Sequence, residues 1–161
     1  MILVATDGSE SARAAVWTAC DIARATGDNL LFVAVWGELR RAYSLTYAGP
    51  MVPGVLDAGR QLAEDALSAA ETAAEAAGVA SAPILRRGNP ASEICALARD
   101  RGARMIVMGS HGWGALRSAV FGSVSKGVLH HASCPVLVVR AGAAPAQRAS
   151  EEEALPAQRA G

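Results

Sequence analysis

MIVMGSHGWGALRSAVFGSVS, from Met105 to Ser125, has the clearest structural signal in this 161-residue chain. Its first four residues are apolar and predict a short strand that is buried on both faces. The strand stops at Gly109, and Gly122 begins a segment up to His131 that predicts a helix. The first N–H groups of a helix lack intrahelical partners and lie at the positive end of its dipole. A strand, a glycine loop and a helix start therefore predict an anion site.

The glycine spacing of this loop distinguishes it from two common phosphate-binding motifs. Two residues separate Gly109 from Gly112 and nine separate Gly112 from Gly122, which matches neither G-x-G-x-x-G nor G-x-x-x-x-G-K-[ST]. We interpret Gly122, with the N–H groups and hydroxyls of Ser123 and Ser125, as a phosphate seat rather than a plain helix N-cap. Gly109 and Gly112 either wrap ribose and phosphates with bare backbone or serve a tight turn that needs a positive φ.

The rest of the chain alternates short apolar runs with helical patterns. Strands are expected at 2–5, 30–35, 82–85 and 136–139, and helices at 9–27, 56–77, 90–102 and 123–132. Pro83 places the third strand at a sheet edge. Buried strands that alternate with helices predict a three-layer, doubly wound α/β fold with an open parallel sheet.

Two segments fall outside this pattern. Residues 37–55 predict one long loop, which is either a lid or partner surface or a plain surface insertion. Residues 141–161, rich in Ala, Pro, Gln and Arg, predict a disordered tail after a single domain at 1–140.

Composition and charge exclude several functions. The formal net charge is zero, which argues against nucleic acid and anionic membranes as partners. The three cysteines are far apart in the sequence and fit neither a disulfide framework nor a zinc site. They favour a location in the reducing cytoplasm. No apolar run approaches the roughly 20 residues of a spanning helix, and no export signal is visible.

The motifs together resemble one known family. The Gly-x2-Gly-x9-Gly-Ser loop, VATDGS at residues 4–9, Gly88-Asn89-Pro90 and CPVLVV at residues 134–139 resemble the ATP-binding branch of the universal stress protein family over about residues 1–140. The resemblance implies an adenine nucleotide alpha hydrolase-like, Rossmann-like sheet with strand order 3-2-1-4-5, and a homodimer through strand Val136–Val139. In that order the winding reverses between strands 1 and 4, where open α/β sheets bind ligands.

Residues and resemblance together predict the cofactor-binding set Ala5, Thr6, Asp7, Val35, Met108, Gly109, His111, Gly112, Gly122, Ser123, Val124 and Ser125. Ala5, Val35 and Met108 line an adenine slot or are plain core. The carboxylate of Asp7 suits ribose hydroxyls, an adenine amino group or a Mg²⁺ on the phosphates, or it forms an Asx turn or helix cap.

The expected function is nucleotide binding rather than fast catalysis. His111 has no nucleophile and acid partners at recognisable spacing, so no residue is assigned as catalytic or as a protein ligand of a metal. We expect an ATP-binding, stress-responsive regulator with at most slow ATP hydrolysis. Trp113 stands where the family commonly has arginine, which favours an AMP or cyclic AMP module as an alternative. A nucleotide-free dimeric partner protein is the other alternative. An enzyme of the ATP pyrophosphatase or adenylyltransferase type would need an S-G-G-x-D-S phosphate loop or an H-x-G-H signature, and neither is present.

Overall fold

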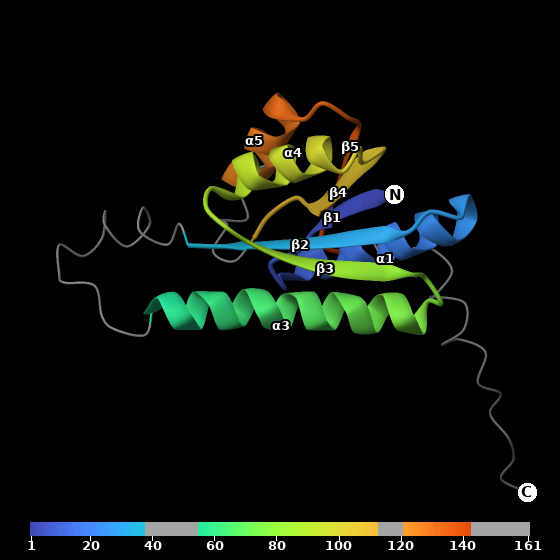
Figure 1. Ribbon diagram of the computed structural model, residues 1–161, viewed down its shortest axis with the longest axis horizontal. Coiled ribbons are helices and arrows are strands. Elements are labelled where there is room, and N and C mark those ends of the chain that lie inside the picture. The colour runs from blue at the N-terminus through green and yellow to red at the C-terminus, as the bar shows by residue number, and fades with distance from the viewer. Residues whose placement is uncertain (38–54, 113–120, 143–161) are drawn as a thin grey trace, which may run out of the picture.

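The computed structural model describes residues 1–37, 55–112 and 121–142. It forms one parallel sheet in the order β3-β2-β1-β4-β5 (Figure 1). The strands are β1 Ile2–Ala5, β2 Leu30–Trp36, β3 Ser81–Arg87, β4 Met105–Gly109 and β5 Val136–Val139. The helices are α1 Glu10–Thr26, α3 Val55–Ala76, α4 Pro90–Asp100 and α5 Ser123–His131. The predicted fold class and strand order are confirmed.

The helices cover the sheet in two layers, α1 and α3 on one face and α4 and α5 on the other (Figure 1). Val4 and Phe32 are fully buried in the cluster under α1 and α3. Leu3 and Ile106 are fully buried in the cluster under α4 and α5. Because both faces are covered, the strands are apolar without alternation, as the sequence predicted.

Local capping sets where α1 begins and ends. The Ser9 hydroxyl accepts a hydrogen bond from the Ala12 N–H at 3.4 Å and serves as the N-cap. Gly27 ends the helix in the left-handed conformation with φ of 70°, which side chains rarely adopt. Both boundaries agree with the sequence expectation. This places the start of α1 directly after β1.

The third strand is longer than the sequence suggested. It runs from Ser81 to Arg87 rather than over 82–85, because all seven residues pair with β2. Pro83 is tolerated because β3 pairs with β2 alone in this sheet and is an edge strand, as predicted. The extension carries Arg86 and Arg87 to the carboxyl end of the sheet.

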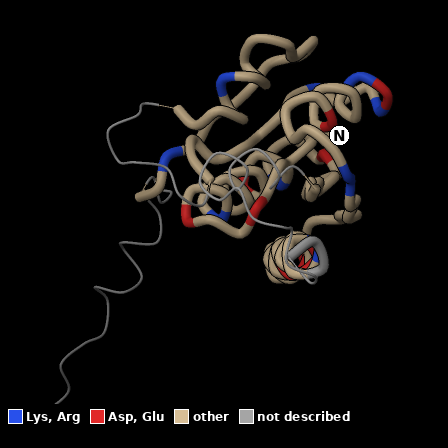
Figure 2. The backbone as a smooth tube through the Cα atoms, turned by 90° about the vertical axis from the view of Figure 1, so that its left-hand side faces the viewer, with Lys and Arg blue, Asp and Glu red and all other residues tan. Residues whose placement is uncertain are grey.

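Several sequence expectations lie outside the described residues. They concern 38–54 of the long loop, Trp113 within the glycine loop, and 143–161 of the predicted tail. Every helix among the described segments is too short or too polar to span a bilayer. Basic and acidic residues are interspersed along the described chain (Figure 2), in keeping with the zero net charge.

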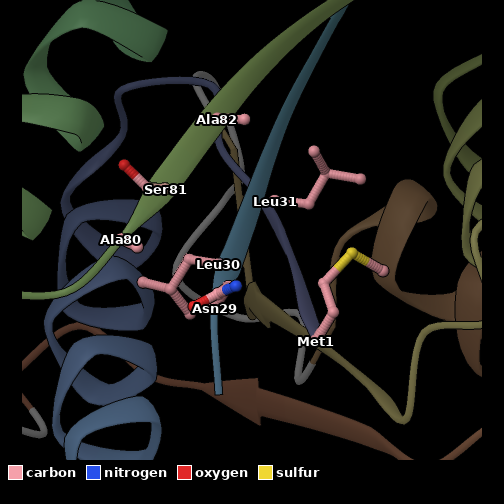
Figure 3. A pocket seen from close by; sticks show the side chains of 7 residues that line it. All are labelled: Met1, Asn29, Leu30, Leu31, Ala80, Ser81 and Ala82. Carbon is pink, nitrogen blue, oxygen red and sulfur yellow. The ribbon is translucent and has the colours of Figure 1, made fainter. Parts of the chain in front are cut away.

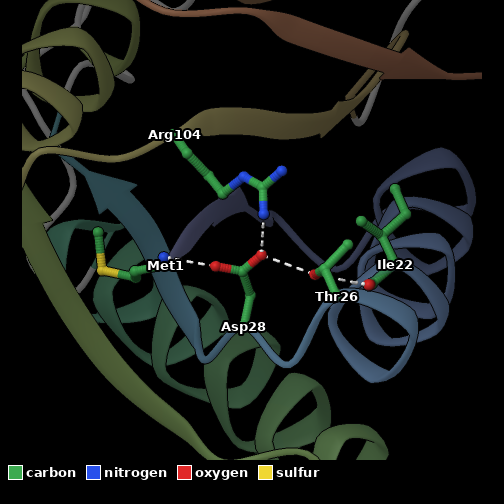
Figure 4. Close-up of polar contacts among 5 residues, drawn as sticks. All are labelled: Met1, Ile22, Thr26, Asp28 and Arg104. Carbon is green, nitrogen blue, oxygen red and sulfur yellow. Dashed lines mark hydrogen bonds and ion pairs between the residues drawn. The ribbon is translucent and has the colours of Figure 1, made fainter.

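Polar contacts at the amino end of the sheet converge on Asp28 (Figure 4). Its carboxylate accepts from the Met1 ammonium at 2.8 Å, from Thr26 Oγ1 at 2.6 Å and from the Arg104 guanidinium at 2.5 Å. The bond from the Met1 ammonium is the largest influence, followed by Thr26 and then Arg104, and together they lower the Asp28 pKa to about 2. This cluster ties β1, β2 and the start of β4 together.

The lowered pKa of Asp28 predicts an acid-dependent loss of stability. The folded pKa lies below the ordinary value of about 3.9, so the contribution is complete above that value and is lost as pH falls toward 2. Asp28→Asn should lower the melting temperature at pH 7 and reduce its fall between pH 5 and 2.5. Asp21→Asn, on the exposed side of α1, is the control and should leave the pH profile unchanged. Parallel melting profiles for Asp28→Asn and the parent would contradict the assignment.

Candidate functional site

The predicted site lies where the carboxyl ends of β1 and β4 meet. Ala5 pairs with Met108 across these strands, so the turn after Ala5 and the loop after Gly109 are neighbours. The chain leaves β1 toward α1 on one face and leaves β4 toward α5 on the other, so the winding reverses here. Open α/β sheets bind ligands at such a switch point.

Asp7 stands at the centre of this junction. Its Oδ1 accepts from the Ser9 N–H at 3.0 Å, which forms the Asx turn that the sequence left as one alternative. Its Oδ2 lies against Gly112, so closely that any side chain at 112 would overlap it. Asp7 is exposed, so one carboxylate both shapes the turn and faces solvent beside the glycine loop.

Close approach of backbone, rather than φ, requires glycine at 109, whereas Gly112 approaches only the end of the Asp7 side chain. Neither has a positive φ, so the tight-turn alternative of the sequence analysis is wrong for both. A Cβ on Gly109 would collide with Ser11 Oγ and lie 2.7 Å from the Ala12 backbone nitrogen. Bare backbone at Gly109 lets the first turn of α1 lie directly on the end of β4. The glycines keep both loops in contact.

Two serines at the start of α1, which the predicted site did not include, hold the glycine loop in place. Ser9 Oγ donates to the His111 carbonyl at 3.1 Å, and Ser11 Oγ donates to the same carbonyl in a short hydrogen bond. The His111 N–H donates in return to Ser11 Oγ at 3.3 Å. No local pattern reveals these bonds, because about a hundred residues separate the partners. Their trace in the sequence is a second serine, Ser11, two residues after the N-cap.

In the described part of the chain, the first turn of α5 has no side chain that caps its backbone N–H groups. Gly122 is the N-cap and provides no side-chain bond to the helix, while its own N–H donates to the Ser110 carbonyl at 2.8 Å. Ser125, which is 2% exposed, donates its hydroxyl to the carbonyls of Gly109 at 3.1 Å and Ser110 at 3.0 Å. Ser123 is exposed. The two predicted phosphate-seat hydroxyls thus differ: Ser125 fastens α5 to β4, and Ser123 is open to a ligand.

The predicted adenine-slot residues lie on one face of the sheet. Ala5 and Met108 are buried in the cluster under α4 and α5, and Val35 packs against it half-buried. Val124, from the first turn of α5, packs against the same cluster. Thr6 is buried, and its N–H donates to the Val33 carbonyl at 2.9 Å. The core alternative therefore describes Ala5 and Met108 at least in part.

His111 contacts neighbouring serines, and the three cysteines have raised pKa values. Nδ1 of His111 lies 3.0 Å from Ser110 Oγ, and the histidine carbonyl receives the two serines described above. Burial, with a smaller influence from Asp21, raises the pKa of Cys20 to about 11. Burial also raises the pKa values of Cys95 and Cys134, so these thiols favour the protonated form. Among the described residues, no group of three or more His, Cys, Asp or Glu side chains could hold a metal ion.

A separate pocket of about 290 Å³ lies at the opposite end of the sheet (Figure 3). Its lining comes from the starts of β1, β2 and β3 and consists of Met1, Asn29, Leu30, Leu31, Ala80, Ser81 and Ala82. It shares no residue with the predicted nucleotide site. Its mostly apolar lining offers few groups to orient a ligand.

Comparisons with known proteins agree with this architecture. The sequence profile of the universal stress protein family matches residues 1–140 of this chain. Universal stress protein YxiE of Bacillus subtilis is 34% identical over 144 residues, which cover 86% of this chain and 97% of that protein. The structure of UspA from Lactobacillus plantarum is 26% identical with a TM-score of 0.70, covering 86% of this chain and 96% of that one. The Archaeoglobus fulgidus universal stress protein in complex with dAMP is 25% identical with a TM-score of 0.64, covering 86% and 95%.

Fold and site together define an open, doubly wound α/β protein with a glycine loop at its switch point. Within that class, the chain belongs to the universal stress protein family.

Proposed function

We propose that this protein binds ATP at the junction of β1, β4 and α5 and acts as a nucleotide-dependent regulator of the stress response. The observation that carries the proposal is the start of α5, where a glycine N-cap without a side-chain bond adjoins the exposed Ser123. Its first-turn N–H groups and the helix dipole favour a phosphate there. The dAMP bound to the Archaeoglobus fulgidus relative supports an adenine nucleotide as the ligand.

Residues near the start of α5 also suit the adenine ring, the ribose and the outer phosphates. Val35, Ala5 and Met108 supply an apolar strip for the adenine ring. Asp7 would repel phosphates if it faced them alone, so it suits ribose hydroxyls or a Mg²⁺ carried by the phosphates. Lys126 is exposed in the first turns of α5 and is available to the outer phosphates. The residues present therefore fit an adenine nucleotide with its metal.

The proposed role is binding rather than turnover. His111 is engaged through its ring with Ser110, and its carbonyl with Ser9 and Ser11. General acid–base catalysis needs a titratable side chain positioned on the reacting atoms. The sequence offers His111 alone in this loop, with no partner acid in a triad arrangement. We expect ATP hydrolysis to be slow at most.

Calorimetric titration of the purified full chain with ATP, with and without Mg²⁺, tests this function. We expect a saturable isotherm with one nucleotide per chain and tighter binding with Mg²⁺. A flat isotherm at millimolar ATP would reject nucleotide binding. Mass spectrometry of small molecules that copurify with the protein gives an independent test of the ligand.

An AMP-class ligand is the second candidate. The observation that favours it is the dAMP complex of the Archaeoglobus fulgidus relative, a monophosphate that needs only one phosphate seat. Competition of AMP and cyclic AMP against bound ATP separates the two candidates. If AMP binds as tightly as ATP, the outer phosphates contribute nothing to affinity and the AMP assignment replaces the ATP assignment.

We further propose that the protein is a homodimer through β5. In the described sheet, β5 pairs with β4 only and leaves its other edge open. The carbonyls of Pro135 and Val139 accept from Ile106 of β4 and from Ser110 directly after it, so alternate residues face β4. The N–H groups of Val136 and Val138 consequently point to the open edge, where a second copy can pair. A two-fold axis would join the two edges antiparallel.

Val138→Pro should convert the dimer to a monomer, because proline removes an outward N–H while the bonds from β5 to β4 remain. Light scattering at matched concentrations gives the oligomeric state. Val138→Ala loses the same packing against the core but keeps the N–H, and it should stay dimeric. A dimeric Val138→Pro protein would place the contact elsewhere, and a monomeric parent would remove the dimer proposal.

A further inference from the structure

Arg86 lies at the carboxyl end of β3, beside the residue assigned to the adenine slot. It is in register with Val35 of β2, and Arg87 is in register with Trp36. Register partners in parallel strands point to the same face, and successive residues to opposite faces. Arg86 therefore shares the α4 and α5 face with Val35, whereas Arg87 stacks over the Trp36 ring on the other face at 5.2 Å.

The Arg86 guanidinium carries a buried donor with no partner. Its Nε is fully buried and makes no hydrogen bond, and it is the only side-chain nitrogen or oxygen of this kind found in the described part of the chain. Folded proteins pair almost every buried polar group, because an unmade hydrogen bond is not compensated by water. A ligand that displaces the protein atoms covering this N–H would supply the missing acceptor.

Glu93, an acidic residue close to this end of β3, forms no ion pair with Arg86. The Glu93 carboxylate, in the first turn of α4, lies next to Gly88, where an added Cβ would be 3.0 Å from its Oε1. Even so, no ion pair joins Arg86 to Glu93 or to another acid in the described segments. The positive charge of Arg86 is therefore available to a ligand.

The position of Arg86 suits the base rather than the phosphates. The phosphate seat adjoins β4, and β1 and β2 separate β4 from β3. Three strand spacings of about 4.8 Å place Arg86 about 14 Å across the sheet from that seat. Val35 lies between them, one strand nearer the seat. A nucleotide with its phosphate on α5 and its base along this edge presents the base to Arg86.

We infer that Arg86 recognises the base, donating its Nε–H to a ring nitrogen of a purine held against Val35. A guanidinium only donates, and purine ring nitrogens such as N7 only accept, so the pair is complementary. This role rests on the proposed nucleotide site and extends it by naming a specificity residue outside the glycine motif. Tripolyphosphate, which has the phosphates of ATP and no base, gains nothing from Arg86.

Calorimetry with ATP and with sodium tripolyphosphate on the full chain tests the inference. Arg86→Gln should weaken ATP binding at least about tenfold, the effect of losing one charge-assisted hydrogen bond, and leave tripolyphosphate binding within about twofold. Arg86→Lys keeps the charge but lacks the Nε–H geometry, and it should resemble Arg86→Gln. Arg87→Gln is the matched control on the opposite face, and both ligands should bind it as they bind the parent.

The other outcomes are equally decisive. Unchanged ATP affinity in Arg86→Gln would overturn base recognition while the nucleotide site stands. Equal weakening of ATP and tripolyphosphate would show that Arg86 acts through general charge or structure, and would also overturn it. Thermal unfolding shows whether each variant is folded. If Arg86→Gln is not folded, the binding of ATP and tripolyphosphate is compared between Arg86→Lys and the parent. A parent protein that binds neither ligand would reject the nucleotide site itself and this inference with it.

Discussion

A valine at position 122 is expected to lower ATP affinity at least about a hundredfold while the protein stays folded. The backbone of Gly122 has φ of −69° and ψ of 167°, which any residue can adopt. An added Cβ would lie 3.4 Å from the Ser110 carbonyl oxygen and 3.6 Å from the His111 Cα, which are ordinary contacts. The valine methyl groups would then occupy the start of α5, where the phosphate is proposed to bind.

The free protein should tolerate this change at modest cost. Replacing a glycine N-cap by an apolar residue destabilises a helix start by about 1 kcal/mol, so a small fall in melting temperature is expected. Gly122→Ala completes a graded series and should bind ATP with intermediate strength. Calorimetry of both variants gives the result. ATP binding at parental strength by a folded Gly122→Val protein would remove the basis for the phosphate seat.

An alanine at position 109 should have the largest effect on stability. The added methyl would overlap Ser11 Oγ and lie 2.7 Å from the Ala12 nitrogen and 2.8 Å from the Ser11 carbonyl carbon. Two of these atoms belong to the α1 backbone, which cannot rotate away. The first turn of α1 must therefore move off β4, and overpacking of this kind costs about 1–3 kcal/mol. The hydrogen bonds of Ser9 and Ser11 to His111 would weaken in the same step.

Gly122→Ala is the matched control for Gly109→Ala. Both add one methyl group to a glycine of the same loop. The methyl at 109 would overlap backbone atoms at 2.7 and 2.8 Å, whereas the methyl at 122 would make ordinary contacts at 3.4 Å or more. Denaturant unfolding of the two variants should therefore show a clearly larger loss of unfolding free energy for Gly109→Ala. Equal losses would mean that α1 does not press on β4 as described.

Local sequence was sufficient for most of the fold. The apolar runs before Thr6 and Gly109, the caps at Ser9 and Gly27, and the edge position of Pro83 depend on neighbours in the chain. Helix capping and strand burial act over a few residues, so their patterns are visible without coordinates. The strand order came from resemblance to a family, and the registers confirm it.

The reasons for individual site residues were less visible in sequence. Gly109 is glycine because the α1 backbone approaches it, and Gly112 lies against the Asp7 carboxylate, whereas the sequence left open a need for positive φ at both. Ser125 was grouped with Ser123 as a phosphate ligand, yet its hydroxyl donates to the carbonyls of Gly109 and Ser110. Arg86 matched no motif and stood out only through its buried, unpaired Nε.

The amino-acid order by itself determined the element types, their sequence along the chain and the two loops that flank the candidate site. Three features required tertiary contacts. They are the close approach of α1 to Gly109, the hydrogen bonds of two serines to the His111 carbonyl, and the placement of Arg86 beside Val35. Periodicity and capping are set by residues within a few positions of one another. Those three features join residues some fifty to a hundred positions apart, which are brought together only when the parallel strands align.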